Sequence, residues 1–236
     1  MQQLLGYMRK AILDYQLIED GDKIAVGVSG GKDSVALLVG LCYLRRFIGI
    51  DYSLTAITLD MGIDGVETDF SPIASLCKEL EVPFLLHHSE IGEIIFHVRK
   101  EKNPCSLCAR MRRGLLHDLT KENGCNKIAL GHHYNDVVET FLMNLFNEGR
   151  IGCFSPKSYL SRKDLTLIRP LVYAPEKDIA SAVRRNGLPV VKSSCPADGH
   201  TSRQWTKEFL QQMEQKNRGI TSRIYGAIKR GHVDGF

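Results

Sequence analysis

The sequence of 236 residues lacks any apolar run close to the about 20 residues that a membrane-spanning helix needs. Residues 1–10 lack the basic-then-apolar order of a secretory signal peptide. The seven cysteines are odd in number and spread over a long chain, which argues against a secreted disulfide framework. No internal repeat or low-complexity segment stands out. These absences predict a cytoplasmic protein without membrane association, whose thiols are available for metal binding or catalysis.

The net charge of +4 is distributed unevenly along the chain. From Thr201 onward, seven basic side chains face three acidic ones, and this accounts for the whole excess. We therefore predict a main domain over residues 1–195 and a basic helical tail over residues 196–236. A basic tail is suited to contact with nucleic-acid phosphates, although a solvated helix face has the same composition.

Short apolar runs alternate with amphipathic stretches throughout the main domain. Strands are expected at residues 24–28, 54–59, 83–86, 127–130 and 165–168. Helical patterns cover residues 35–44, 72–80 and 137–146. Continuous apolar runs are typical of parallel strands that are buried on both faces. The alternation predicts a doubly wound α/β fold, with a mainly parallel sheet, helices on both faces and a ligand site beyond the carboxyl ends of the strands.

An anion-binding loop directly follows the first expected strand. Its glycines let the backbone approach an oxyanion, and the next helix turns its free N–H groups toward the same place. The loop is not a Walker A motif, because Val26 stands where the first glycine is required and Asp33 follows the lysine. A carboxylate beside phosphates requires Mg²⁺ or a strongly positive environment. The residues of this loop are Ser29, Gly30, Gly31, Lys32, Asp33 and Ser34.

Polar residues also follow two other expected strands. Asp60 ends the second strand, and Gly131 ends a later one, where a nucleotide could pack against its backbone. Asp136 begins the next helix, where a carboxylate can cap the helix or coordinate Mg²⁺ through water. The roles of His132 and His133 stay open, and one of them is expected to be a packed core histidine.

Three cysteines form a candidate metal site. Cys105 and Cys108 make a Cys-x-x-Cys pair, and Cys195 lies far downstream. A thioredoxin-like redox pair is disfavoured, because the first strand–helix turn is a nucleotide loop. Spacing alone does not choose between tetrahedral zinc, with His200 as fourth ligand, and a three-cysteine [4Fe–4S] cluster with one open iron. Of the other cysteines, Cys42 and Cys77 fall in apolar helical patterns and are expected in the core, while Cys125 and Cys153 stay unassigned.

The loop at residues 29–34 resembles the pyrophosphate-binding loop of the PP-loop ATPases, and residues 58–60 and 130–136 match that superfamily's adenosine and Gly-His-x-x-x-Asp segments. The resemblance implies that ATP and Mg²⁺ are bound, with Lys32, Asp33 and Asp136 in catalysis. It also implies that Asp60 and Gly131 help to hold the nucleotide.

A more specific resemblance extends over most of residues 20–200. The segments Cys-Ser-Leu-Cys-Ala-Arg-Met-Arg-Arg, Leu-Gly-His-His and Ile-Arg-Pro-Leu are similar to the tRNA 2-thiocytidine synthetase branch. The resemblance implies a [4Fe–4S] cluster on Cys105, Cys108 and Cys195. It implies ATP-dependent transfer of sulfur to C2 of an anticodon-loop cytidine, with sulfide or a cysteine desulfurase as the source. Asp198 stands where the branch has a further cysteine, and the zinc ribbons of the related 2-thiouridine branch are missing.

Further expectations concern partners and alternatives. A homodimer is plausible, because a tRNA is large compared with one small domain. The alternatives are another tRNA-modifying PP-loop ligase, such as a lysidine-type enzyme, and a non-catalytic nucleotide-binding module. Candidate tRNA contacts are Arg110, Arg112, Arg113, Arg184, Arg185 and the basic tail.

Overall fold

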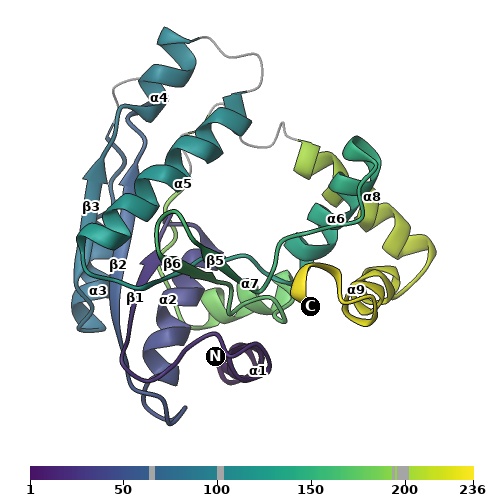
Figure 1. The fold of residues 1–236 in the computed structure, drawn as a ribbon, viewed down its shortest axis with the longest axis horizontal. Helices are drawn as coiled ribbons and strands as arrows, with labels where there is room; N and C mark the ends of the chain where they lie inside the picture. Colours follow the sequence, from purple (N-terminus) through teal and green to yellow (C-terminus); the bar gives the residue numbers. More distant parts are fainter. Residues whose placement is uncertain (64–66, 100–103, 193–194, 196–201) are drawn as a thin grey trace.

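The computed structural model describes residues 1–63, 67–99, 104–192, 195 and 202–236. Six strands form one sheet in the order β3-β2-β1-β4-β6-β5 (Figure 1). The strands are β1 (Asp22–Gly27), β2 (Tyr52–Asp60), β3 (Phe84–His88), β4 (Lys127–Ala129), β5 (Lys157–Leu160) and β6 (Leu165–Ile168). All neighbours pair in parallel except β5, which is antiparallel to β6 at the edge. The predicted α/β fold with a mainly parallel sheet is confirmed.

The five expected strands are all present, and the unpredicted β5 differs from them in its sequence. Its sequence, Lys-Ser-Tyr-Leu, has no apolar run, and its side chains are half-buried or exposed. An edge strand pairs on one side only, so it does not need the apolar pattern that identifies a central strand.

Alternating residues of β1 face two different cores. Ile24 and Val26 lie in the main hydrophobic cluster, whereas Ala25 packs with Ile57 and Leu119 on the opposite face. The main cluster is built with α1 (Gln2–Asp14), α2 (Lys32–Leu44), α3 (Ser71–Glu79), α6 (Tyr134–Glu148) and α7 (Glu176–Arg185). The other face is covered by α5 (Pro104–Glu122), which follows the short α4 (Ile91–Glu93) and a π-helical turn at Ile94–Val98. Cys42 and Cys77 are buried in the main cluster, as predicted.

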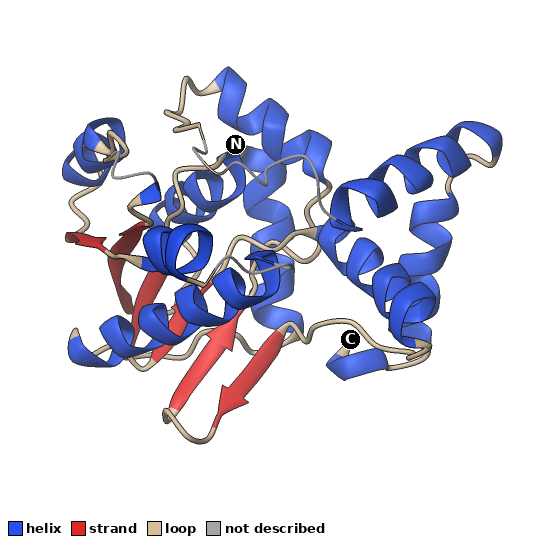
Figure 2. Cartoon of the chain, turned by 90° about the horizontal axis from the view of Figure 1, so that it is seen from above, coloured by secondary structure: helices blue, strands red, loops and turns tan. Residues whose placement is uncertain are grey.

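The C-terminal helices are packed against the body of the protein. The helices α8 (Ser202–Lys216) and α9 (Ile220–Arg230) contact α6 and each other, and together they form a helical group beside the sheet (Figures 1 and 2). A final short turn covers Val233–Gly235. The Tyr225 hydroxyl of α9 donates a 2.9 Å hydrogen bond to the Val172 carbonyl, which fixes this group to the main domain. Among the described helices, none is long and apolar enough to cross a membrane.

Candidate ATP and thiol sites

The loop between β1 and α2 is held in shape by its own serines and by Gly30. The Ser29 N–H donates to the Ser34 hydroxyl at 3.2 Å, and that hydroxyl in turn donates to the Gly31 carbonyl at 2.8 Å. Gly30 has a φ of +81°, and a Cβ there would lie 2.8 Å from the Cβ of Val191. Gly31 is the N-cap of α2 and has no side chain to cap the helix. The first N–H groups of α2 are therefore available to an anion, as predicted for a phosphate loop.

Lys32 begins α2 and is held between two carboxylates. Its Nζ lies 3.0 Å from Asp33 Oδ2 and 3.0 Å from Glu176 Oε1, and Lys207 of α8 reaches the same Glu176 oxygen at 2.7 Å. Burial opposes ionisation of Lys32, but the two carboxylates outweigh it and raise its pKa. Burial likewise opposes ionisation of Glu176, but the two lysines lower its pKa to about 2. Both groups are therefore charged at neutral pH.

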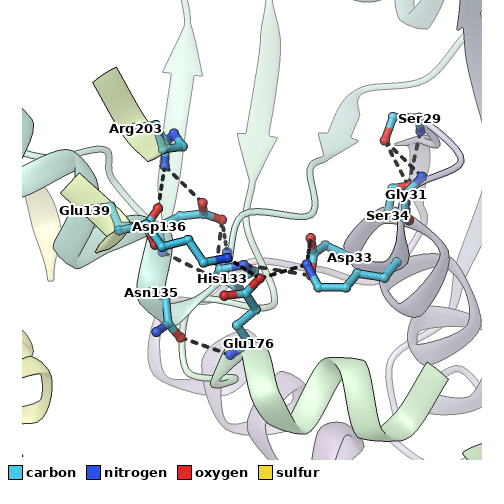
Figure 3. A network of polar contacts seen from close by, with 12 residues as sticks. Ser29, Gly31, Asp33, Ser34, His133, Asn135, Asp136, Glu139, Glu176 and Arg203 are labelled. Carbon is cyan, nitrogen blue, oxygen red and sulfur yellow. Dashed lines mark hydrogen bonds and ion pairs between the residues drawn. The ribbon is translucent and has the colours of Figure 1, made fainter. Parts of the chain in front are cut away.

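His133 lies between the two aspartates that were predicted to act with Mg²⁺ (Figure 3). Its Nδ1 accepts a 3.3 Å hydrogen bond from the Asp136 N–H, while Asp136 Oδ2 accepts one of 2.9 Å from the His133 N–H. This reciprocal pair caps α6, so Asp136 does act at the helix N-terminus. On the other side, His133 Nε2 lies 3.8 Å from Asp33 Oδ1.

The free oxygen of Asp33 provides a test of the Mg²⁺ prediction. Asp33 Oδ1 is shielded from solvent and accepts no hydrogen bond from any described residue. A buried oxygen without a donor is costly, by roughly 1–3 kcal/mol. A hard cation prefers this kind of ligand, so the carboxylate fits a magnesium site.

Arg203 of α8 joins the cluster from the C-terminal helices (Figure 3). Its guanidinium lies 3.0 Å from Asp136 Oδ1 and 3.4 Å from Glu139 Oε2, and it donates to the Thr140 hydroxyl at 3.1 Å. Burial, with Asp136 nearby, raises the pKa of Glu139 to about 7 despite this partner. Sequence reasoning missed Glu139, Glu176 and Arg203. Only the position of Glu139 one turn after Asp136, on the same helix face, could have suggested any of them.

Gly131 has a structural reason to be glycine. A Cβ at this position would lie 3.0 Å from the backbone carbon of Asp33 and 3.0 Å from the backbone nitrogen of Ser34. The end of β4 therefore packs directly against the first turn of α2. Within the described residues, the atoms nearest to Gly131 belong to the phosphate loop itself. The contact of Gly131 with a nucleotide stays a prediction.

Asp60 lies at a separate cavity beyond the ends of β2 and β3. The carboxylate accepts hydrogen bonds from the N–H groups of Gly62 and Thr68, and His88 Nδ1 lies 3.3 Å from its Oδ2. The cavity has a volume of about 290 Å³ and is mostly acidic. Within the described residues, Asp60 makes no polar contact with residues 29–34, so its predicted role with the nucleotide stays a prediction. The strand reaches the loop through Thr58, whose hydroxyl donates to the Val28 carbonyl at 2.7 Å.

Two of the candidate metal ligands, Cys105 and Cys195, act electrostatically on the third, Cys108. Burial raises the pKa of the Cys108 thiol, and the Cys195 and Cys105 thiols raise it further, whereas Arg112 lowers it. Such an effect acts between nearby groups, so Cys105 and Cys195 both lie in the neighbourhood of Cys108. In the described part of the chain, no three His, Cys, Asp or Glu side chains are arranged to hold a metal ion. The set is nevertheless purely of soft sulfur donors, which fits iron–sulfur or zinc chemistry. His200 and Asp198 lie outside the described residues.

The predicted RNA-contacting arginines fall into two groups. Arg110, Arg112 and Arg113 are exposed on the cysteine-bearing part of α5. Arg184 and Arg185 are exposed on the last turn of α7, about 12 Å along the helix from Glu176 at its start. The structure thus brings the first group to the thiols, and it does not bring the second group to the site.

His132 belongs to a neighbouring cluster at the ends of β4 and β6. Burial, with Arg169 nearby, lowers the pKa of His132 to about 4, so the ring is neutral. The Phe154 ring packs against His132 at 5.0 Å and below the Arg169 guanidinium at 4.8 Å. Burial, together with Arg113 of α5, lowers the pKa of Arg169 to about 10. His132 and Arg169 therefore lie between Asp136 on one side and Arg113 of α5 on the other.

A PP-loop domain family model matches residues 5–214, which include the phosphate loop, α5 and most of α8. The chain belongs to the PP-loop family. The chain is 40% identical over 225 residues to a tRNA-cytidine(32) 2-sulfurtransferase of Geobacter sulfurreducens, covering 93% of this chain and 86% of that protein. A protein of the same name from Pelobacter propionicus is 41% identical over 226 residues, covering 94% and 83%. These relatives are sulfurtransferase enzymes, and they confirm the predicted relation to the 2-thiocytidine branch.

A solved structure supports the same fold. The U34-tRNA thiolase NcsA from Methanococcus maripaludis, with its [4Fe-4S] cluster, superposes with a TM-score of 0.78 at 24% identity. The match covers 96% of this chain and 78% of the thiolase. The PP-loop chain described here therefore shares the architecture of the thiolase.

Proposed function

We propose that this PP-loop protein uses ATP to activate C2 of a cytidine in the anticodon loop of tRNA and replaces the C2 oxygen with sulfur. One observation carries the proposal: a phosphate loop and three cysteines, two of which act electrostatically on the third, occur together in a chain 40% identical to a tRNA-cytidine(32) 2-sulfurtransferase. The relatives' name supports cytidine 32 as the target base.

The ATP phosphates would bind at the loop and the start of α2. The N–H groups and Lys32 would stabilise negative charge on the leaving pyrophosphate. Lys32 would exchange its contact with Glu176 for a phosphate oxygen. Asp33, through an Oδ1 that accepts no hydrogen bond from the described residues, and Asp136 would hold Mg²⁺, which would neutralise phosphate charge when bound.

Activation is a transfer of AMP to the base. The C2 oxygen of cytosine forms a bond to the α-phosphorus, and the bond from that phosphorus to the α,β-bridging oxygen breaks. Pyrophosphate leaves with the bonding electron pair. The product has AMP on the C2 oxygen, and this makes that oxygen a good leaving group.

Sulfur transfer completes the reaction. The sulfur of sulfide bonds to C2, the C2–O bond breaks, and AMP departs with the original base oxygen while the protons of the sulfide pass to solvent. Cys105, Cys108 and Cys195 would hold a [4Fe–4S] cluster, which when bound supplies one iron with a free position for sulfide. The cluster named for the structurally similar thiolase supports this choice over zinc. Sulfide itself or a cysteine desulfurase is the proposed source.

Anaerobic purification tests the cluster. We expect iron–sulfur absorbance and about four iron atoms per chain, given a [4Fe–4S] centre. Cys195→Ala should lose both, whereas Cys125→Ala, which alters a buried thiol on the opposite side of the sheet from α2, should keep both. A colourless protein that binds no iron would contradict the cluster assignment.

The ATP and tRNA steps are tested separately. Asp33→Asn should abolish ATP–pyrophosphate exchange while the fold is retained. Asp20→Asn is the matched control, because Asp20 accepts a hydrogen bond from the Asp51 N–H before the amino end of β1, whereas the loop follows the carboxyl end of β1, and asparagine can accept the same bond. Nucleoside analysis of tRNA treated with ATP and sulfide should show 2-thiocytidine. If thiolation proceeds without ATP, the activation step is wrong.

A further inference from the structure

An exposed aromatic cluster lies on the side of α8 away from Arg203. The Trp205 and Phe209 rings are stacked, with centroids 5.7 Å apart and planes 14° apart. Phe146 of α6 meets Phe209 edge-on at 5.7 Å and Trp205 at 6.3 Å. Trp205 is 56% exposed and Phe146 is 47% exposed. We call Phe146, Trp205 and Phe209 the aromatic patch.

The patch is close to the site that we propose for ATP. Phe146 follows Glu139 by seven residues on α6, a rise of about 10 Å. Trp205 follows Arg203, which contacts Asp136 and Glu139, by two residues on α8. About 10 Å is the height of three stacked bases at roughly 3.4 Å each. A nucleic-acid loop with one base near the site carboxylates could therefore reach the patch with a neighbouring base.

Positively charged side chains lie at the C-terminal end of α8 and beyond it, beginning with one on the face that carries Trp205. Lys216 follows Trp205 by eleven residues, so the helical period places both on one face, and Arg218 comes just after the helix ends. Lys216, Arg218, Arg223 and Arg230 are exposed, and none forms an ion pair within the described residues. Nearby carboxylates are engaged: Glu214 accepts from the Gly219 and Thr221 N–H groups, and Glu148 pairs with Arg150. Glu208 is exposed and accepts from Gln204.

We propose that the aromatic patch is a stacking platform for unpaired bases of the tRNA anticodon loop, adjacent to the base that is modified. This rests on the proposed function and extends it to a specific surface. Exposed rings stack on unpaired bases, and flanking cations contact their phosphates. A second copy of this chain fits less well, because two such faces would bring together unpaired cations of the same sign.

The platform can be observed directly, because Trp205 is the only tryptophan in the chain. The probe is an anticodon stem-loop RNA with cytidine at position 32, titrated into the full-length protein. Stacking should quench the Trp205 fluorescence saturably, whereas a fully paired duplex of the same length should quench it much less. Equal quenching by both RNAs would overturn the stacking proposal.

Variants give the size of the effect. With labelled stem-loop, Trp205→Ala should weaken Kd roughly 5- to 100-fold, the range for loss of one base–aromatic stack, and Trp205→Phe should restore most of the affinity. Phe47→Ala is the matched control. Phe47 is also 56% exposed, but it lies just beyond the far end of α2, about 20 Å from the phosphate loop.

Turnover and sedimentation separate the remaining outcomes. Trp205→Ala should raise KM for tRNA with little change in kcat. Binding and quenching without 2-thiocytidine would reject the proposed function and leave the platform standing. Normal KM and Kd in a folded Trp205→Ala protein would reject the platform and leave the function standing. A Trp205→Ala protein that loses self-association but binds RNA normally would show that the patch is a contact between copies.

Discussion

Gly131 links the fold of this protein to the geometry of its phosphate loop. In Gly131→Ala, the new methyl group would lie 3.0 Å from the Asp33 carbon, 3.0 Å from the Ser34 nitrogen and 3.1 Å from the Asp33 oxygen. Favourable carbon contacts are about 3.5–4.0 Å. All three neighbours are backbone atoms, so neither β4 nor α2 can relieve the overlap by rotating a side chain. We expect a loss of about 1–3 kcal/mol, as for other overpacked positions.

The loss should appear in both stability and activity. Urea unfolding should show a lower midpoint with an unchanged m-value. Because the displaced turn of α2 carries Asp33 and Ser34, ATP–pyrophosphate exchange should also fall, by roughly tenfold or more. Gly114→Ala is the control, since a Cβ at this position of α5 meets nothing within 4 Å. It should stabilise the protein by about 0.5–1 kcal/mol. An unchanged midpoint and unchanged exchange in Gly131→Ala would refute the packing argument.

Three further predictions concern buried charge. The pKa of Glu139 is about 7 in the folded protein, well above its ordinary value, so the unchanged protein should lose stability as pH rises from about 4.5 to 7. Glu139→Gln does not titrate, so over this range it should gain up to about 3 kcal/mol relative to the unchanged protein. Urea unfolding at several pH values measures this difference. A constant difference across that range would contradict it. Lys127→Met should cost about 3–5 kcal/mol in urea unfolding, because the buried Asp22 carboxylate, 2.7 Å from Lys127 with both side chains 5% exposed, would lose its cation and keep only its neutral hydrogen-bond donors. The double variant with Asp22→Asn should recover part of this loss, and no recovery would show that the pair is not coupled. Arg203→Ala should weaken the contact of α8 with α6 and increase proteolysis of α8, and equal cleavage rates would contradict it.

The sequence predicted those features that depend on neighbouring residues. The apolar runs identified five of the six strands, and the phosphate loop was recognised because its glycines, lysine and serines lie within six consecutive residues. The cap by Asp136 was also visible locally, since a helix N-terminus is determined within one turn.

The partners of these groups could not be predicted, because they come from distant parts of the chain. Arg203 is 67 residues from Asp136, and its contact depends on how α8 packs on α6. Nothing near Glu176 in sequence indicates that it meets Lys32. The choice between His132 and His133 also needed coordinates, because two adjacent residues after a strand point in different directions. One faces Phe154 and the other faces the two aspartates.

The charges of the proposed ATP site indicate what must enter together with a nucleotide. In the described part of the site, four carboxylates (Asp33, Asp136, Glu139 and Glu176) face three cations (Lys32, Arg203 and Lys207). With a pKa of about 7, Glu139 is only partly ionised at neutral pH, so the cluster is close to neutral before any ligand binds. A triphosphate would add several negative charges to a half-buried group of side chains whose three cations are already paired, and such charge is costly unless it is paired. ATP binding should therefore depend steeply on a divalent cation, with Asp33 Oδ1, which accepts no hydrogen bond from the described residues, as one ligand oxygen.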